Sequence, residues 1–187
     1  MKNTLLAVFF TIFTSFTAVA HAELPPVNGE PVTQLDWSAL MPEDYSLDSL
    51  FDDQQEQLAN IDDYSNEAML LMDEMMAKLQ SAPIVPEMDG KMVRIPGFVV
   101  PVQGDGETIK TFFLVPYFGA CLHLPPPPSN QIVYVNFEPG TSIDNLYDAI
   151  WVTGKLTIEN THNDLASSGY SLEAYVIEPY EAPPIEG

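Results

Sequence analysis

The stretch KMVRIPGFVVPV, residues 91–102, decides the fold, because the spacing of apolar residues changes there from helical to strand-like. Upstream of Pro86, apolar residues recur at every third or fourth position, as they do in amphipathic helices. From Lys91 onward they recur at every second position, which is typical of a strand with one buried face. Pro96 and Gly97 interrupt this stretch, and they indicate an edge or a bulge instead of a central ladder position.

Four further strands are predicted downstream of this stretch. They cover Thr108 to Val115, Gln131 to Phe137, Trp151 to Glu159 and Ser171 to Glu178, with turns at Gly104-Asp105-Gly106 and Glu138-Pro139-Gly140. A short helix is expected over Ser142 to Asp148, between the third and fourth strands. Five short strands with a helix at this place predict a small antiparallel β-barrel of the OB type. A generic small barrel or sandwich is the alternative.

Two helices are predicted before the barrel. The first covers Asp48 to Asn60 and is moderately amphipathic, and the second runs from Glu67 to Gln80 with Ser65 or Asn66 as its cap. The second helix carries four methionines, namely Met69, Met72, Met75 and Met76. Their helical spacing favours an apolar packing face, and binding of Cu(I) by the thioethers is the alternative. The chain is therefore predicted to be α+β, with an N-terminal helical extension on the barrel.

The first 22 residues have the features of a secretory signal peptide. A positive Lys2 precedes an apolar run from Leu5 to Val19, and Ala20-His21-Ala22 forms a small-x-small cleavage site. The run is short for a membrane span, and no cysteine near the cleavage site could carry a lipid anchor. We therefore expect a soluble periplasmic protein that does not insert directly into the membrane. The predicted organisation is a signal peptide (1–22), an extended acidic arm (23–46), a helical segment (47–86), the β-barrel domain (87–180) and a disordered tail (181–187).

The charge of the chain limits its partners. It has 27 acidic residues against 6 basic ones, which gives a formal net charge of −21. Such a charge repels nucleic acid phosphates and anionic lipid surfaces, so we expect no nucleic acid partner. It attracts cations and basic protein surfaces, although acidity of an exported protein can also serve solubility alone.

The segment PYFGACLHLPPPPSNQ, residues 116–131, contains the residues with the most distinctive chemistry. Its Cys121 is the single cysteine of the chain, so no intramolecular disulfide can form in an oxidising compartment. Cys121 and His123 are two residues apart, and on an extended segment both would lie on one face as zinc ligands. His162 is the third candidate ligand, completed by a carboxylate such as Asp144, Asp148 or Asp164. The alternative is that Cys121 is a small buried residue without chemistry.

An enzyme is not predicted. A cysteine and a histidine can form a nucleophilic pair, but the local signatures of cysteine proteases are absent here. A phosphate-binding glycine loop, a nucleophile elbow and a His-Glu-x-x-His motif are absent from the sequence as well.

The four prolines of the segment predict a stiff polyproline II rod. Pro125, Pro126, Pro127 and Pro128 could form a docking ridge for a protein partner together with Tyr117 and Phe118. The alternative is a rigid connecting loop that packs against Tyr117, Phe118 or Tyr134.

Three segments of the chain resemble a bacterial envelope family of unknown function, whose members are short exported proteins or lipoproteins. They are FLVPYFGACLHLPPPPSNQ (113–131), GKMVRIPGFVVP (90–101) and LDWSALMP (35–42), and the resemblance spans about residues 35–178. Some members of this family lie beside ATP-binding-cassette transporter genes in zinc-responsive clusters. The resemblance implies an accessory role in metal import and favours Cys121 and His123 as metal contacts.

The sequence therefore predicts a periplasmic, non-enzymatic accessory or binding protein that supports zinc import by a transporter of the ATP-binding-cassette type. Zinc is the candidate cofactor, and a transporter component is the expected protein partner. A structural interaction module of the envelope with no metal role is the alternative, and a cysteine-dependent enzyme is a third, less favoured one.

Overall fold

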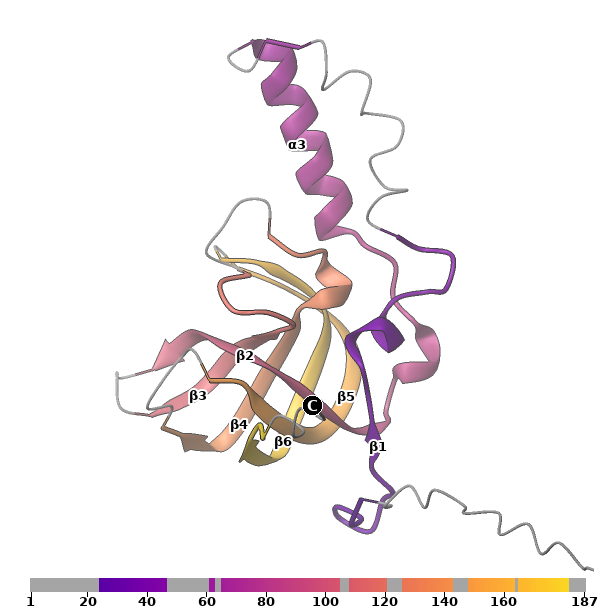
Figure 1. The fold of residues 1–187 in the computed structure, drawn as a ribbon, viewed down its shortest axis with the longest axis vertical. Helices are drawn as coiled ribbons and strands as arrows, with labels where there is room; N and C mark the ends of the chain where they lie inside the picture. The colour runs from indigo at the N-terminus through magenta and orange to yellow at the C-terminus, as the bar shows by residue number, and fades with distance from the viewer. Residues whose placement is uncertain are drawn as a thin grey trace, which may run out of the picture.

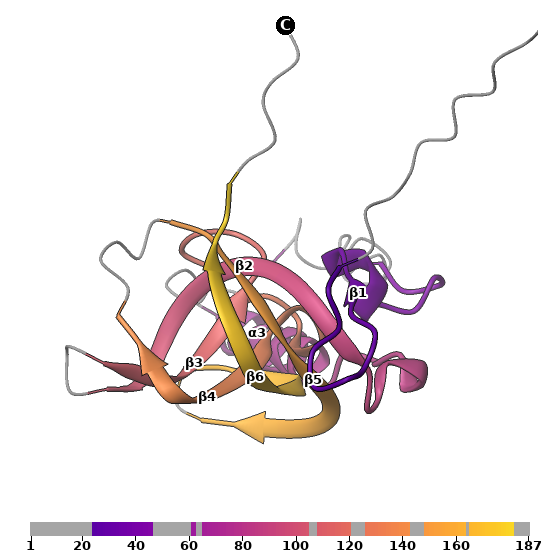
Figure 2. The same cartoon turned by 90° about the horizontal axis from the view of Figure 1, so that it is seen from below.

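Five strands close into a β-barrel in the computed structural model, which describes residues 24–46, 61–62, 65–104, 108–120, 126–142, 148–163 and 165–181 (Figure 1). The strands of the barrel are β2 (Met92–Gly104), β3 (Ile109–Val115), β4 (Val133–Thr141), β5 (Ile150–His162) and β6 (Ser167–Pro179). Their order is β2-β3-β4-β6-β5, and β5 pairs back with β2 to close the ring, which is seen from below in Figure 2. The described part of the chain is thus mostly β with one α-helix, so the barrel and the second helix of the predicted α+β fold are present.

One pair of neighbouring strands is parallel, so the prediction of an entirely antiparallel barrel is wrong at this pair. β4 and β6 run in the same direction, whereas the other four pairs of the barrel are antiparallel. The reason is the route of the chain. β5 follows β4 in sequence but lies beside β2, and β6 returns antiparallel to β5, so it reaches β4 in the direction of β4 itself. Hydrophobic alternation within a strand does not contain this information.

At Pro96 and Gly97 the pairing of β2 changes from β5 to β3. Residues 92–97 pair with β5, and residues 98–104 pair with β3. The sequence predicted an edge or a bulge here, but the two residues lie in the ladder with β5, at its end. A Cβ on Gly97 would lie 2.7 Å from Leu114 Cγ and 2.8 Å from the carbonyl oxygen of Val115. Glycine therefore allows β2 and β3 to approach closely at this corner.

The five predicted strands are all present, and most extend further than the sequence suggested. One difference is at Glu138-Pro139-Gly140, which was predicted to turn the chain. β4 continues through these residues to Thr141, and its pairing with β3 is irregular between Asn136 and Thr141. Gly140 has a φ of +74°, which permits the extra residues to bulge out of the ladder. The predicted helix over 142–148 lies almost entirely outside the described residues.

A single α-helix is present in the described part of the chain. α3 (Asn66–Gln80) begins one residue before the predicted Glu67, and the Ser65 side chain accepts a hydrogen bond from the Ala68 N–H at 3.0 Å. This is the expected N-cap. The helix projects from one end of the barrel in Figure 1. Within the described residues, no helix is both long enough and apolar enough to span a bilayer. The predicted first helix over 48–60 and the predicted signal peptide lie outside these residues.

The N-terminal arm lies along the outside of the barrel. Its short strand β1 (Thr33–Gln34) pairs in parallel with β2 at Val93 and Arg94, and the 3₁₀ helix η1 (Trp37–Leu40) follows. The side chains of Leu35 and Leu40 are buried in the core, and Trp37 packs against it. The indole N–H of Trp37 donates to the Pro96 carbonyl at 2.8 Å, so the arm is fixed at the corner of β2.

β3 is buried on both of its faces, and this position sets the location of the candidate site. Phe112 and Leu114 point into the main core, together with residues of the other barrel strands. Phe113 and Val115, on the opposite face, form a second apolar cluster with Ala120, Ile132 and Ala166. The second cluster therefore packs the beginning of the cysteine-containing segment against the outside of the barrel.

Substitution of Gly154 by alanine is expected to destabilise the barrel. A Cβ on Gly154 would overlap the carbonyl oxygen of Glu173 and lie 2.8 Å from Ala174 Cα, and these backbone atoms cannot move away freely. We expect Gly154→Ala to lower the free energy of unfolding by about 1–3 kcal/mol in urea titrations. The control is Gly90→Ala, where no atom lies within 4 Å and the positive φ of +74° alone should cost about 1–2 kcal/mol. A Gly154→Ala protein as stable as the wild type would contradict the described pairing of β5 with β6.

Candidate functional site

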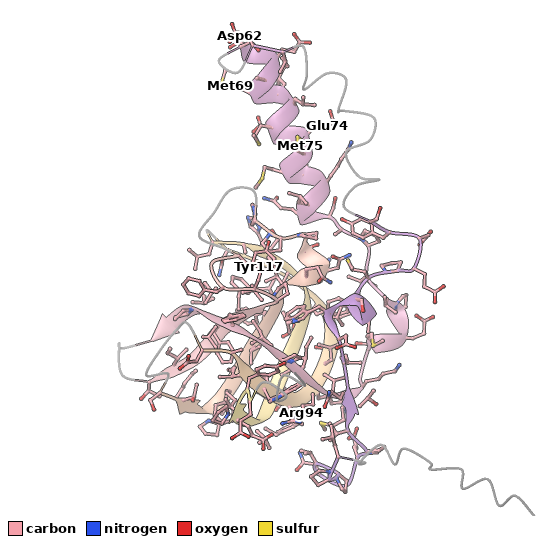
Figure 3. The ribbon with its side chains drawn as sticks, viewed as in Figure 1. Asp62, Met69, Glu74, Met75, Arg94 and Tyr117 are labelled. Carbon is pink, nitrogen blue, oxygen red and sulfur yellow. The ribbon has the colours of Figure 1, made fainter. Side chains whose placement is uncertain are left out.

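The segment that contains Cys121 begins as a tight turn after β3. Gly119 has a φ of +78°, and the Ala120 N–H donates to the Tyr117 carbonyl at 3.4 Å. Ala120 is buried in the second apolar cluster, whereas Tyr117 and Phe118 are 54% and 45% exposed. Phe118 contacts Phe98 edge to face, with 6.2 Å between the ring centroids. The turn therefore presents two aromatic side chains to solvent directly before Cys121, and Tyr117 is labelled in Figure 3.

The segment ends in a buried 3₁₀ turn, η4 (Ser129–Gln131), that is anchored by its polar side chains. Asn130 Nδ2 donates to the Pro83 carbonyl at 2.8 Å, and Gln131 Nε2 donates to the Trp37 carbonyl at 2.9 Å. All three residues of η4 are buried, although they are polar. Because buried polar groups need hydrogen-bond partners, these bonds fix the segment to both the arm and the chain that follows α3.

The polyproline run enters this anchor. Pro127 and Pro128 are buried and Pro126 is half-buried, while Pro125 lies outside the described residues. Their fixed φ values hold the chain extended as it enters the core. Of the predicted partner-binding residues that the structure describes, Tyr117 and Phe118 have the greatest exposure. The docking role of the group stays a prediction.

Of the three predicted metal ligands, the structure describes His162. Cys121 and His123 lie outside the described residues, so their metal role stays a prediction. His162 is exposed at the end of β5, and its Nδ1 lies 2.6 Å from Ser167 Oγ. Among the described residues, no group of three histidine, cysteine, aspartate or glutamate side chains could hold a metal ion.

His162 nevertheless lies at the end of the barrel where the segment begins. It lines a cavity of about 470 Å³ that Ser129 of η4 also lines. Ala120, directly before Cys121, shares the second apolar cluster with Ala166, which is four residues beyond His162. The fold therefore brings the β5–β6 connection and both ends of the cysteine-containing segment to the same region.

Tyr170 connects the elements around this region, and sequence reasoning did not identify it. Its side chain is fully buried, its hydroxyl donates to the Leu40 carbonyl at 3.0 Å, and it accepts a hydrogen bond from the Val85 N–H at 2.7 Å. Burial raises the pKa of Tyr170, which keeps the hydroxyl protonated and able to donate. The pattern of the sequence gives no signal for this role, because Leu40, Val85 and Tyr170 are far apart along the chain.

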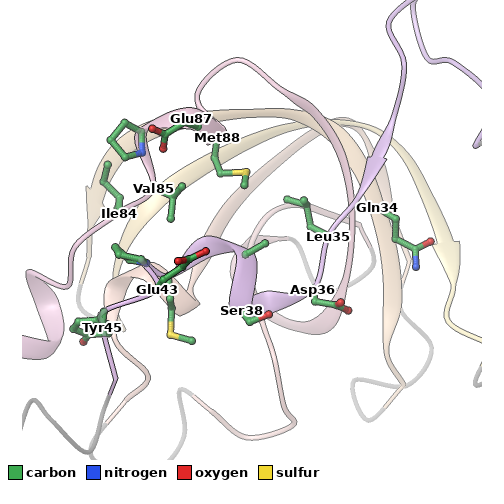
Figure 4. Close-up of a pocket in the computed structure, with 14 residues that line it drawn as sticks. Gln34, Leu35, Asp36, Ser38, Glu43, Tyr45, Ile84, Val85, Glu87 and Met88 are labelled. Atoms are coloured by element: carbon green, nitrogen blue, oxygen red, sulfur yellow. The ribbon is translucent and has the colours of Figure 1, made fainter.

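A groove of about 900 Å³ opens between the arm and the residues that follow α3 (Figure 4). Its walls are largely apolar, with Leu35 and Met41 from the arm and Ile84 and Met88 from the other side. Three carboxylates also line it, from Asp36, Glu43 and Glu87. Its described lining contains no basic side chain, so the groove suits a ligand or segment that combines apolar groups with positive charge.

The fold and these sites define a small mixed β-barrel protein with an N-terminal arm and a projecting helix. The chain belongs to the family described as "Protein of unknown function (DUF3299)", whose model matches residues 37–179. It is similar to a DUF3299 family protein, PA4066 from Pseudomonas aeruginosa PAO1, whose crystal structure was determined at 2.45 Å resolution. The two are 32% identical with a TM-score of 0.61, over 81% of this chain and 97% of the other. A search of curated proteins finds no match.

The Tyr170 hydroxyl is expected to contribute measurably to stability. Tyr170→Phe leaves the Leu40 carbonyl and the Val85 N–H without their buried partner, so the free energy of unfolding should fall by about 1–3 kcal/mol. Tyr180→Phe is the matched control, since Tyr180 is 37% exposed, and it should change stability by less than about 0.5 kcal/mol. Equal stabilities of the two variants in urea titrations would contradict the network.

The same hydroxyl predicts a pH dependence. The pKa of Tyr170 is raised in the folded protein, so the stabilisation is fully present below the unfolded value of about 10 and is lost as the pH rises through the folded value. As the pH rises above about 10, the wild type should lose stability more steeply than Tyr170→Phe. Ionisation of the other tyrosines affects both proteins, so it cancels in the comparison. If the free energy of unfolding falls with pH equally in the wild type and in Tyr170→Phe, Tyr170 is not a buried, protonated group.

Proposed function

We propose that this protein is a non-enzymatic binding protein of the bacterial envelope that serves as an accessory component of a zinc transporter. The observation that carries the proposal is that both ends of the segment with Cys121 (residues 116–131) are fixed to the barrel. One end is packed through Ala120, and the other is held through the hydrogen bonds of Asn130 and Gln131. Loops positioned on a rigid barrel are a common location of binding residues.

The exposed aromatic side chains support a protein partner. Tyr117 and Phe118 are exposed in the turn that precedes Cys121, and aromatic residues are enriched at the centres of protein interfaces. In this proposal the transporter component contacts these two side chains and the polyproline run, of which Pro126 is half-buried. Compartment and partner follow from the predicted signal peptide and from the resemblance to family members encoded beside transporter genes.

Zinc would be bound by Cys121 and His123, with His162 as the third ligand. The proposal is supported by the second apolar cluster, which contains both Ala120, directly before Cys121, and Ala166, in the connection between β5 and β6. The segment and His162 therefore lie in the same region. Rotation of His162 away from Ser167 would free its Nδ1 to bind a metal. Two or three protein ligands leave a position open, so the ion could be shared with the partner or released to it.

A structural interaction module without metal is the second candidate function, and the burial of η4 favours it. In that case the segment has only a folding role, because Pro127 to Gln131 are buried and Asn130 and Gln131 bond to the Pro83 and Trp37 carbonyls. The acidic, apolar groove beside the arm would then be the binding surface, and a basic apolar segment of a partner would be its occupant.

We also propose that the barrel is of the OB type. Around the barrel the strands have the order β2-β3-β4-β6-β5, and β5 pairs with β2. When the five barrel strands are numbered from one along the chain, this order is 1-2-3-5-4. The proposal is supported by this order, by the parallel pairing of β4 with β6 and by the number of strands, since the OB fold is a five-stranded Greek-key barrel. The charge of −21 disfavours the oligonucleotide binding for which many OB folds are used.

Zinc titration by calorimetry tests the metal role. The wild type should bind Zn²⁺ with release of protons, because a thiolate must form, and the Cys121→Ser, His123→Ala double variant should lose this binding. His162→Ala should weaken the binding without abolishing it. Equal weak binding, or no binding, in the wild type and the double variant would contradict the proposal.

Thermal melting separates the two candidate functions. If the segment is only a folding element, the double variant should melt at a lower temperature, and Zn²⁺ should not change the melting temperature of the wild type. If the segment binds metal, Zn²⁺ should raise the melting temperature of the wild type, because a ligand that binds only the native state stabilises it.

A further inference from the structure

α3 carries a row of methionines that the proposed zinc site does not use. Met69 and Met72 are 57% and 51% exposed, and Met76 is half-buried. The helix projects away from the barrel, and Met69 lies near its outer end (Figure 3). The buried side chains of α3 are Leu71 and Leu79, and neither is a methionine. The sequence favoured a packing role for the four methionines, and the exposure of Met69 and Met72 is not explained by that role.

The positions of these residues bring three thioethers to one face of the helix. Met69, Met72 and Met76 are spaced by three and four residues, so at about 100° per residue they lie within an arc of about 60°. Along the axis, successive members are separated by about 4.5 and 6 Å at a rise of 1.5 Å per residue. A methionine side chain has three flexible bonds, so the three sulfur atoms can reach a common ion near Met72.

We propose that Met69, Met72 and Met76 bind Cu(I). Thioethers are soft, neutral ligands that suit Cu(I) and bind poorly to hard cations, which prefer oxygen ligands. The charges of the helix are compatible with a cation. Asp73 is exposed beside the row, and Lys78, the single basic residue of α3, pairs with Glu74 at 3.3 Å. The site is independent of Cys121 and His123 in its residues and in its metal.

The test measures Cu(I) transfer to the full chain from the coloured bicinchoninate complex, without oxygen. The protein carries Cys121→Ser, which removes the single thiolate that could bind Cu(I). We expect this protein to take up about one Cu(I) per chain. Adding Met69→Leu, Met72→Leu and Met76→Leu should abolish the uptake, because leucine retains the apolar volume and the helix propensity but lacks the sulfur.

The matched control adds Met41→Leu and Met88→Leu, two methionines of the groove beside the arm. It should retain the uptake, and circular dichroism should show the same helix content in all three proteins. Uptake that is equal in the triple-leucine variant and the control would overturn the proposal. An absence of uptake by the Cys121→Ser protein would overturn it as well. Neither result bears on zinc binding by Cys121 and His123, which the calorimetric titration tests separately.

Discussion

Pairing of β2 with two neighbours at once is the constraint on which the rest of the structure depends. Its first half pairs with β5 and its second half with β3, so the sheet closes into a barrel. Closure requires a close approach at Gly97, where a Cβ would meet Leu114 and Val115. The Pro96 carbonyl at this corner accepts the hydrogen bond from Trp37, which in turn positions the arm.

The arm and the cysteine-containing segment stabilise each other through buried polar contacts. The Trp37 carbonyl accepts from Gln131, and the Leu40 carbonyl accepts from Tyr170, so the arm supplies acceptors to two different parts of the barrel. Such contacts specify a single arrangement, because each group would be costly to leave unpaired after burial. The functional consequence is a segment whose two ends are fixed, next to exposed aromatic residues that can contact a partner.

Periodicity predicted the local structure well, since it depends on neighbouring residues alone. The strand over 91–102 and the helix capped by Ser65 are found where apolar spacing and capping chemistry indicated them. Residues near the candidate site were harder to interpret. Asn130 and Gln131 are ordinary polar residues in sequence, and their burial depends on carbonyls of Pro83 and Trp37 that the chain brings to them from 47 and 94 residues away.

The sequence by itself determined the strands, the helix and the acidic charge. Only the tertiary structure decided the parallel pairing of β4 with β6, the network around Tyr170 and the exposure of Met69 and Met72. The physical reason is the distance along the chain over which each interaction acts. Apolar periodicity and capping act within a few residues, whereas strand order, burial and long-range hydrogen bonds depend on which distant segments meet after the barrel has closed.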